Sequence, residues 1–211
     1  MADQTQAAEG VLLRWAWRLA LITVLYNVLE GVVSVLAGRA SGSVALVGFG
    51  LDSFVESLSG LVMLWRFFPR REAFDHAREM QRERRAVLLV GLSFLALSAY
   101  VGYESIHKLV FQEIPRPSVL GIAIAVVSLI AMPLLFYGKK RIALQLGSRS
   151  LQADARQTLA CMFLSFALLL GLVLNYSVGF WQADPLVGLL IAFFLLREGV
   201  EAIRQRQLCQ C

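Results

Sequence analysis

Two carboxylates lie four residues apart in the middle of an apolar segment, ALVGFGLDSFVESLSGLVML. Asp52 and Glu56 are separated by about one helical turn, so a helix places both on one face, roughly 6 Å apart along its axis. An ionised carboxylate at the centre of a bilayer costs about 2.5–3.5 kcal/mol, so this face must point away from lipid. Two interpretations fit: a site for a cation or for protons, and a buried hydrogen-bonded pair that shares one proton.

The composition decides which solvent surrounds these acids. Of the 211 residues, 58% are hydrophobic and 17% are charged, and the mean hydropathy is +0.66. Soluble domains contain roughly 45–50% apolar residues, so we predict an all-α integral membrane protein. Apolar runs of about 20 residues predict six transmembrane helices, at about 15–37, 44–65, 87–110, 118–138, 151–174 and 183–203.

Basic residues predict the orientation of these helices. They gather in the connection after the second span, which has seven arginines, and in the connection after the fourth, which begins with Lys139 and Lys140. By the positive-inside rule both termini are cytoplasmic, and we expect the cytoplasmic (inner) membrane. The sequence pI of 9.4 reflects this topology, so no nucleic-acid partner is needed to explain it. The predicted domains are a cytoplasmic tail at 1–14, the six-helix transmembrane domain at 15–203, and a short cytoplasmic tail at 204–211.

A second polar face lies near the start of the fifth predicted span, SLQADARQTLACMF. Asp154, Gln157 and Cys161 follow i, i+3, i+7 spacing and share one stripe of a helix. The fifth span runs opposite to the second, so Gln157 and Cys161 lie at depths similar to those of Glu56 and Asp52. Two carboxylates, an amide oxygen and a thiolate make a four-ligand shell for a divalent transition metal. We therefore predict that these four residues form a metal site between the two helices.

This arrangement resembles the cation diffusion facilitator (cation efflux) family of proton-coupled divalent-metal transporters. YNVLEGVVSVLAGRASGSVALVGFGLDSFVESLSG resembles the first two helices of that family, SLQADARQTLAC the fifth and WQADPLVGLLIAFFLL the sixth. The resemblance implies that the family's acidic pair on the second helix falls on Asp52 and Glu56. Its His-x-x-x-Asp pair on the fifth helix falls on Gln157 and Cys161, and these two departures leave the metal identity open. The family's cytoplasmic metal-binding domain has no counterpart in the sequence, so we expect a transmembrane-only branch.

Several other polar residues have two interpretations each. Asn27 and Glu30, three residues apart in the first span, either line an outer cavity or bond to neighbouring helices. Asp154 lies one turn toward the cytoplasm from the predicted ligands, where it either passes ions to the site or pairs with Arg149 or Arg156. These residues are candidate entry or outer ligands.

Three cysteines fit a reducing compartment without a disulfide framework. Cys161 lies within the fifth span, whereas Cys209 and Cys211 end the sequence as a C-x-C on the cytoplasmic side. The terminal pair either captures a soft metal or belongs to a tail without a function of its own.

Local signals predict helix ends and helix contacts. Asp184 followed by Pro185 predicts the N-cap and first turn of the last span. Small residues beside the acids, including Gly50 and Gly60, favour close approach of the second span to the fifth, and Gly31 either does the same for the first span or serves a dimer contact.

The predicted function is secondary transport of divalent transition-metal cations by alternating access, with metal leaving the cytoplasm in exchange for entering protons. Zinc, iron(II), cobalt, manganese and cadmium are the candidate cargoes, with no other cofactor. The expected partners are the metal, protons, membrane lipid and a second copy of the chain. The competing hypothesis is a non-transporting scaffold, sensor or partner subunit that keeps the transporter fold. No Ser/His/Asp constellation or phosphate loop appears, so we predict no enzymatic activity.

Overall fold

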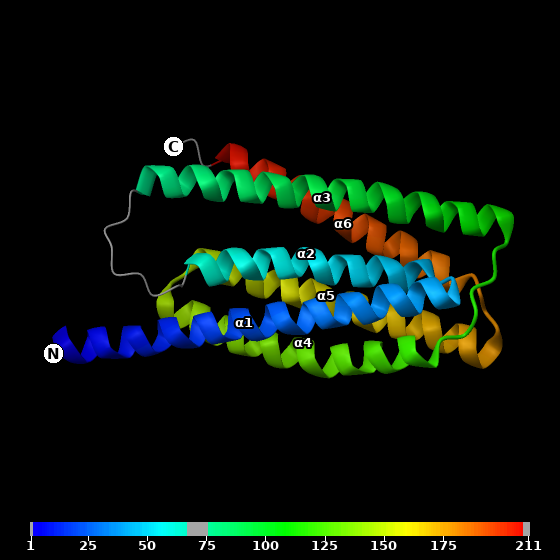
Figure 1. Ribbon diagram of the computed structural model, residues 1–211, viewed down its shortest axis with the longest axis horizontal. Helices are drawn as coiled ribbons and strands as arrows, with labels where there is room; N and C mark the ends of the chain where they lie inside the picture. The colour runs from blue at the N-terminus through cyan, green and yellow to red at the C-terminus, as the bar shows by residue number, and fades with distance from the viewer. Residues whose placement is uncertain (1, 67–75, 209–211) are drawn as a thin grey trace.

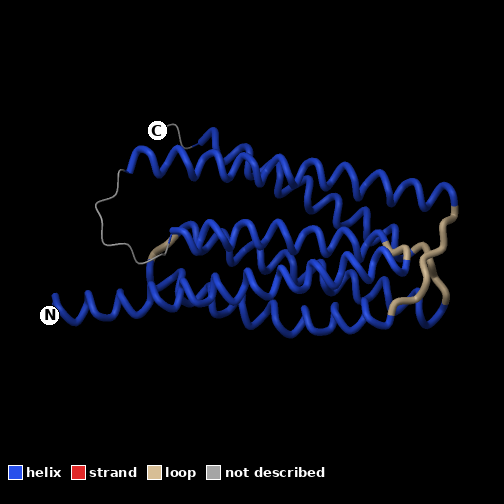
Figure 2. The backbone as a smooth tube through the Cα atoms, in the orientation of Figure 1, coloured by secondary structure: helices blue, strands red, loops and turns tan. Residues whose placement is uncertain are grey.

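The computed structural model describes the backbone of residues 2–66 and 76–208. Over these residues the chain is helical and contains no strand (Figures 1 and 2). Both ends of the described chain lie at the same end of the bundle, as an even number of antiparallel helices requires (Figure 1). The helices are α1 Ala2–Ser41, α2 Val44–Arg66, α3 His76–Phe111, α4 Val119–Leu146, α5 Arg149–Val178 and α6 Ala183–Leu208.

Each of the six predicted spans lies almost entirely within one of these helices, and most of the helices are longer than predicted. The fourth span was predicted to end at residue 138, but α4 continues to Leu146. α4 ends where Gly147 takes a left-handed conformation (φ 60°), and Lys139, within the helix, is fully buried and bonds to partners inside the bundle. The sequence therefore placed Lys139 outside the bundle, and the structure places it inside.

Four helices contain stretches that are long and apolar enough to cross a membrane, at Gly10–Ser41, Val44–Trp65, Val119–Leu146 and Asp154–Val178. The described parts of α3 and α6 do not meet the same criterion, although the sequence predicts spans there. Large apolar side chains are exposed on the outward faces of the helices, among them Leu25, Leu29 and Leu36 of α1 and Leu134 of α4. Such surfaces are typical of helices that face lipid, and the chain is an integral membrane protein.

Four of the helices form a closed ring. α1 packs on α2 and α4, and α5 packs on α4 and α2. The remaining helices, α3 and α6, pack against each other as a pair, and this pair lies along α2, with α6 also touching α5 (Figure 1). α1, α2, α4 and α5 thus form the core of the bundle.

Glycines bring α2 close to α1. A Cβ atom added to Gly31 of α1 would lie 2.9 Å from the carbonyl oxygen of Gly50, and one added to Gly60 of α2 would lie 2.6 Å from a methyl group of Val24. Neither distance leaves room for a side chain. The prediction that Gly50 and Gly60 serve the contact with α5 was wrong, because their neighbours are on α1.

The start of α6 is anchored to the start of α2. Asp184 accepts a hydrogen bond from the backbone N–H of Val44, at 2.9 Å, and another from the hydroxyl of Ser43. The aspartate therefore caps α2, so the prediction that Asp184 caps its own helix was wrong. Ser43 Oγ in turn accepts a hydrogen bond from the N–H of Leu46 at 3.0 Å. These bonds set the register of α6 against α2.

Candidate metal site

One acid of α2 meets the thiol of α5. The Sγ atom of Cys161 donates a hydrogen bond to Oδ2 of Asp52, with the two atoms 3.0 Å apart. Both side chains are buried. Asp52 thus contacts α5 through Cys161, the residue predicted to lie at its level.

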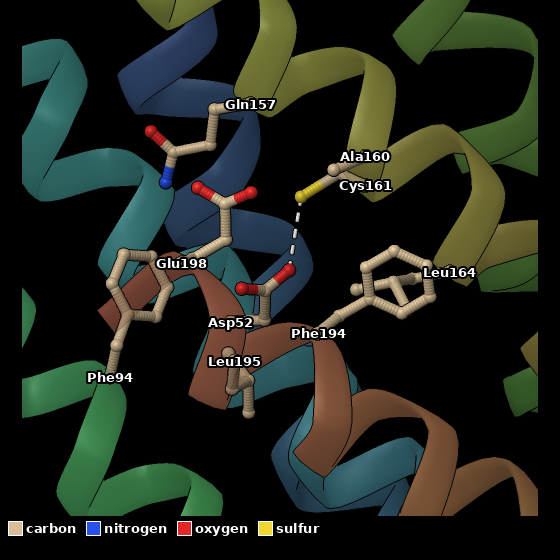
Figure 3. Close-up of a pocket in the computed structure, with 9 residues that line it drawn as sticks. All are labelled: Asp52, Phe94, Gln157, Ala160, Cys161, Leu164, Phe194, Leu195 and Glu198. Carbon is tan, nitrogen blue, oxygen red and sulfur yellow. Dashed lines mark hydrogen bonds between the residues drawn. The ribbon is translucent and has the colours of Figure 1, made fainter. Parts of the chain in front are cut away.

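A small cavity adjoins this pair (Figure 3). Gln157, on the same stripe of α5 as Cys161, also faces the cavity, and its buried Nε2 atom has no hydrogen-bond partner among the described residues. The carboxylate of Glu198, from α6, extends into the same space and lies beside Gln157 (Figure 3). The remaining walls are apolar and come from α3, α5 and α6, namely Phe94, Ala160, Leu164, Phe194 and Leu195.

Glu198 is a residue that the sequence reasoning did not single out. The predicted sixth span included it without assigning a role to it. An ionisable residue inside a predicted span is itself a signal for a functional site, and this signal was present in LLREGVE. The sequence does not show in which direction the side chain of Glu198 points.

The other acid of α2 faces a different set of partners. Glu56 Oε1 accepts a hydrogen bond from the Thr158 hydroxyl at 2.7 Å and lies 3.9 Å from Nζ of Lys139. Glu56 is fully buried and does not line the cavity. Although Asp52 and Glu56 are one helical turn apart, they thus take part in separate interactions.

Asp154 pairs with a lysine of α4. Nζ of Lys139 lies 2.8 Å from Oδ2 of Asp154 and donates a hydrogen bond to Thr158 Oγ1, also at 2.8 Å. The hydroxyl of Ser59 donates to Oδ1 of Asp154 at 3.3 Å. The predicted partners of Asp154 were Arg149 or Arg156; Arg156 is exposed, and the side chain of Arg149 lies outside the described residues. The partner that the structure shows is Lys139.

Asn27 and Glu30 lie on the α1 side of the bundle. Glu30 accepts hydrogen bonds from the Tyr26 hydroxyl at 2.7 Å and from the Ser53 hydroxyl at 2.9 Å. Glu30 therefore bonds to its neighbouring helix α2, as one of the two interpretations proposed. Asn27 is fully buried, and neither atom of its amide group has a hydrogen-bond partner among the described residues. Neither residue lines the cavity.

The geometry presents a pair of donors beside a cavity. Among the residues that the structure describes, no three His, Cys, Asp or Glu side chains lie close enough together to hold one metal ion. A metal ion bound by Asp52 and Cys161, with the thiol proton displaced, would need a further donor to move toward them. Gln157 and Glu198 border the same cavity, whereas Glu56 would first have to leave Thr158. The predicted tail ligands Cys209 and Cys211 lie outside the described residues.

Comparison with known proteins covers most of the chain. It is 28% identical over 189 residues to transmembrane protein 163 of Xenopus laevis, covering 89% of this chain and 64% of that protein. It is 25% identical over 197 residues to the cation-efflux pump FieF of Cronobacter sakazakii, again covering 89% of this chain and 64% of the relative. A probable cation efflux system protein of Mycobacterium tuberculosis is 27% identical over 186 residues, which are 85% of this chain and 54% of that protein.

The chain thus spans between about half and two thirds of the length of these curated relatives. The cation efflux transmembrane domain matches residues 20–206, a range that contains the described cavity and all six helices in whole or in large part. The chain therefore belongs to the cation efflux family.

Proposed function

We propose that the protein is a secondary transporter of divalent transition-metal cations that exports metal from the cytoplasm in exchange for protons. The observation that supports this function is the contact between Asp52 and Cys161, which joins α2 to α5 beside a cavity inside the bundle. An ionisable pair is expensive to keep within a membrane. Inside a membrane, a carboxylate and a thiol can serve transport if a metal ion and protons compete for binding to them.

The exchange follows from the chemistry of the pair. A thiol must lose its proton to bind a metal ion, so binding at Cys161 releases a proton, and reprotonation releases the metal. In an alternating-access cycle the bundle opens first toward the end that carries both termini and then toward the opposite end. Reprotonation from the opposite side then drives each metal ion out as protons enter.

The thiolate of Cys161 determines which metal ions we propose as cargo. A soft sulfur ligand favours zinc, cadmium or iron(II) over magnesium and calcium, with cobalt and manganese as further candidates. The proposed ligands are Asp52, Cys161 and Gln157, with Glu56 joining them only if it leaves its hydrogen bond to Thr158.

We also propose the setting in which this cycle runs. Basic residues are concentrated in the connections that follow α2 and α4, and this favours a cytoplasmic location for those connections and for both termini, with the protein in the inner membrane. Arginines there are suited to anionic lipid headgroups. A homodimer remains part of the proposal, and cross-linking in membranes is its test.

Metal flux into proteoliposomes tests the proposed function. Purified protein is reconstituted with a pH-sensitive dye inside, and zinc, cadmium, iron(II), cobalt and manganese are added in turn. We expect metal uptake coupled to proton movement in the opposite direction, and no uptake with the D52N variant. Folded protein that moves none of these ions would overturn the proposal.

A second candidate function is a non-transporting scaffold or sensor. The ion pair of Lys139 with Asp154, beside Glu56, favours it, because this buried cation already balances acids that a transporter would offer to its cargo. The same flux measurement separates the two functions. Metal binding without flux in any ion gradient would support the sensor.

A further inference from the structure

The cavity beside Asp52 is also lined by an acid of α6 that is not among the ligands proposed above. Glu198 of α6 lines this cavity together with Asp52, Gln157 and Cys161. Glu198 is half-buried, its carboxylate lies beside Gln157, and no hydrogen bond joins it to any of the residues drawn in Figure 3. An acid in this position has oxygen atoms available for a cation.

The register of α6 places Glu198 on one side of Asp52. Asp184 is bonded to the start of α2, so it is level with Val44. Asp52 lies eight residues beyond Val44, and Glu198 lies fourteen residues beyond Asp184. Both helices run in the same direction, so Glu198 is about six residues, or roughly 9 Å, nearer the end that carries the termini.

The direction of the side chain closes part of this gap. Side chains on an α-helix lean toward its N-terminus. On α6 that direction leads from Glu198 back toward the level of Asp52, and Figure 3 shows its carboxylate between Gln157 and Asp52. A cation that enters from the end with the termini therefore meets Glu198 and Gln157 before it meets Asp52 and Cys161.

Because Glu56 does not line the cavity, another residue can supply an acidic ligand there. Glu56 accepts a hydrogen bond from Thr158, lies 3.9 Å from Nζ of Lys139 and does not line this cavity. Asp52 and Cys161 alone are two ligands, whereas transition-metal sites in proteins usually have four. Gln157 and Glu198 are the two further donors that border the cavity.

We propose that Glu198 is a metal-binding residue. It receives a divalent cation at the end of the cavity nearer the two chain termini, and it completes the ligand set with Asp52, Gln157 and Cys161. Glu198 thus takes the part that the sequence assigned to Glu56. This inference rests on the proposed function, since it assumes that the cavity accepts metal. It assigns a ligand from α6 to a site otherwise built from α2 and α5.

Cadmium binding by the full-length protein tests this role without any transport assay. Cys209 and Cys211 are first replaced by serine, so that Cys161 is the only thiol left. The ultraviolet charge-transfer absorption of the cadmium–thiolate bond then reports binding at Cys161, in detergent-solubilised protein titrated with Cd²⁺. E198Q keeps the size of the side chain and removes its charge. We expect a rise of about tenfold or more in the Kd for Cd²⁺.

The matched control is E201Q on the same helix. Glu201 is exposed and does not line the cavity, so the same loss of charge there should change the Kd by less than about twofold. E198D keeps the carboxylate and should recover part of the lost affinity. Size-exclusion profiles that match the wild type establish that each variant is folded.

The outcomes separate this inference from the proposed function. If E198Q binds Cd²⁺ as tightly as the wild type while D52N does not bind it, Glu198 is not a ligand and the proposed site on α2 and α5 stands. An equal loss in E198Q and E201Q would also overturn the inference, because it would be a general effect of charge. If the wild type neither binds Cd²⁺ nor moves any divalent ion, both the inference and the proposed function fail.

Discussion

Asp52 and Glu56 lie one turn apart on α2, yet their surroundings differ in kind. Asp52 bonds to a thiol beside a cavity that α6 helps to enclose. Glu56 lies in a network with Thr158 and Lys139, and that lysine also pairs with Asp154. Two acids of the same helix therefore differ: Asp52 borders a cavity, whereas Glu56 lies near a buried lysine.

Because the two acids have different partners, we expect residues near Asp52 to affect metal binding and residues near Glu56 to affect the stability of the fold. The residues that line the cavity offer donors whose proton or position can change when a cation arrives. Around Lys139, one lysine pairs with Asp154 and lies near Glu56, so removing it leaves buried acids without their cation. Substitutions in these two groups of residues should therefore affect different measurements.

The largest effect on binding is expected for D52N. Asparagine keeps the size of the side chain and deletes the charge next to Cys161, so the Kd for Cd²⁺ should rise about 100-fold or more and metal flux should stop. Thermal unfolding should be close to that of the wild type, because the amide oxygen still accepts the thiol hydrogen bond. Retained Cd²⁺ affinity in this variant would show instead that Asp52 and its neighbours form only a structural pair.

The largest effect on stability is expected for K139M. Methionine fills much of the volume of the lysine but leaves Asp154 without the ammonium group 2.8 Å away, with Glu56 close by. Loss of one partner from a buried ion pair costs about 3–5 kcal/mol, measured as the free energy of unfolding in detergent. The double variant K139M/D154N should recover most of this loss. An unchanged unfolding midpoint in K139M would show that the interactions of Lys139 do not stabilise the fold.

An intermediate effect is expected at Cys161. C161A removes the only sulfur atom at the cavity, so zinc and cadmium affinities should fall about tenfold, whereas C161D should shift preference toward manganese, which prefers oxygen ligands. Isothermal titration in the background without Cys209 and Cys211 measures both. If C161A binds zinc and cadmium like the wild type, Cys161 is only a small buried apolar residue.

The smallest effect on metal binding is expected for E56Q. Glutamine still accepts the hydrogen bond of Thr158, and Glu56 does not border the cavity, so Cd²⁺ affinity should change by less than about threefold. The variant should lose about 1 kcal/mol of stability, because a hydrogen bond to a charged group becomes one between neutral groups. A loss of Cd²⁺ binding as large as that of D52N would place Glu56 in the ligand set predicted from the sequence.

Much of this protein follows from the order of its residues alone. Apolar runs of about 20 residues are long enough only for membrane-crossing or fully buried helices, so the helical fold and the number of helices are predictable. Spacing on α2 and α5 predicts that Asp52 and Cys161 share a level, and their hydrogen bond confirms that the two helices meet there. These predictions depend on distances along one helix, which the helical repeat determines.

Only the tertiary structure decides which face of each helix meets which neighbour. Lys139 stands beside Lys140 in the sequence, and nothing local separates the buried lysine from the exposed one. Asp184 caps α2 across 140 residues of sequence, and Glu198 faces the cavity because that contact sets the register of α6. In a helix that is apolar on most sides, hydrophobic periodicity does not reveal the rotation about the axis. That rotation is decided by close packing and by pairing of polar groups between distant segments.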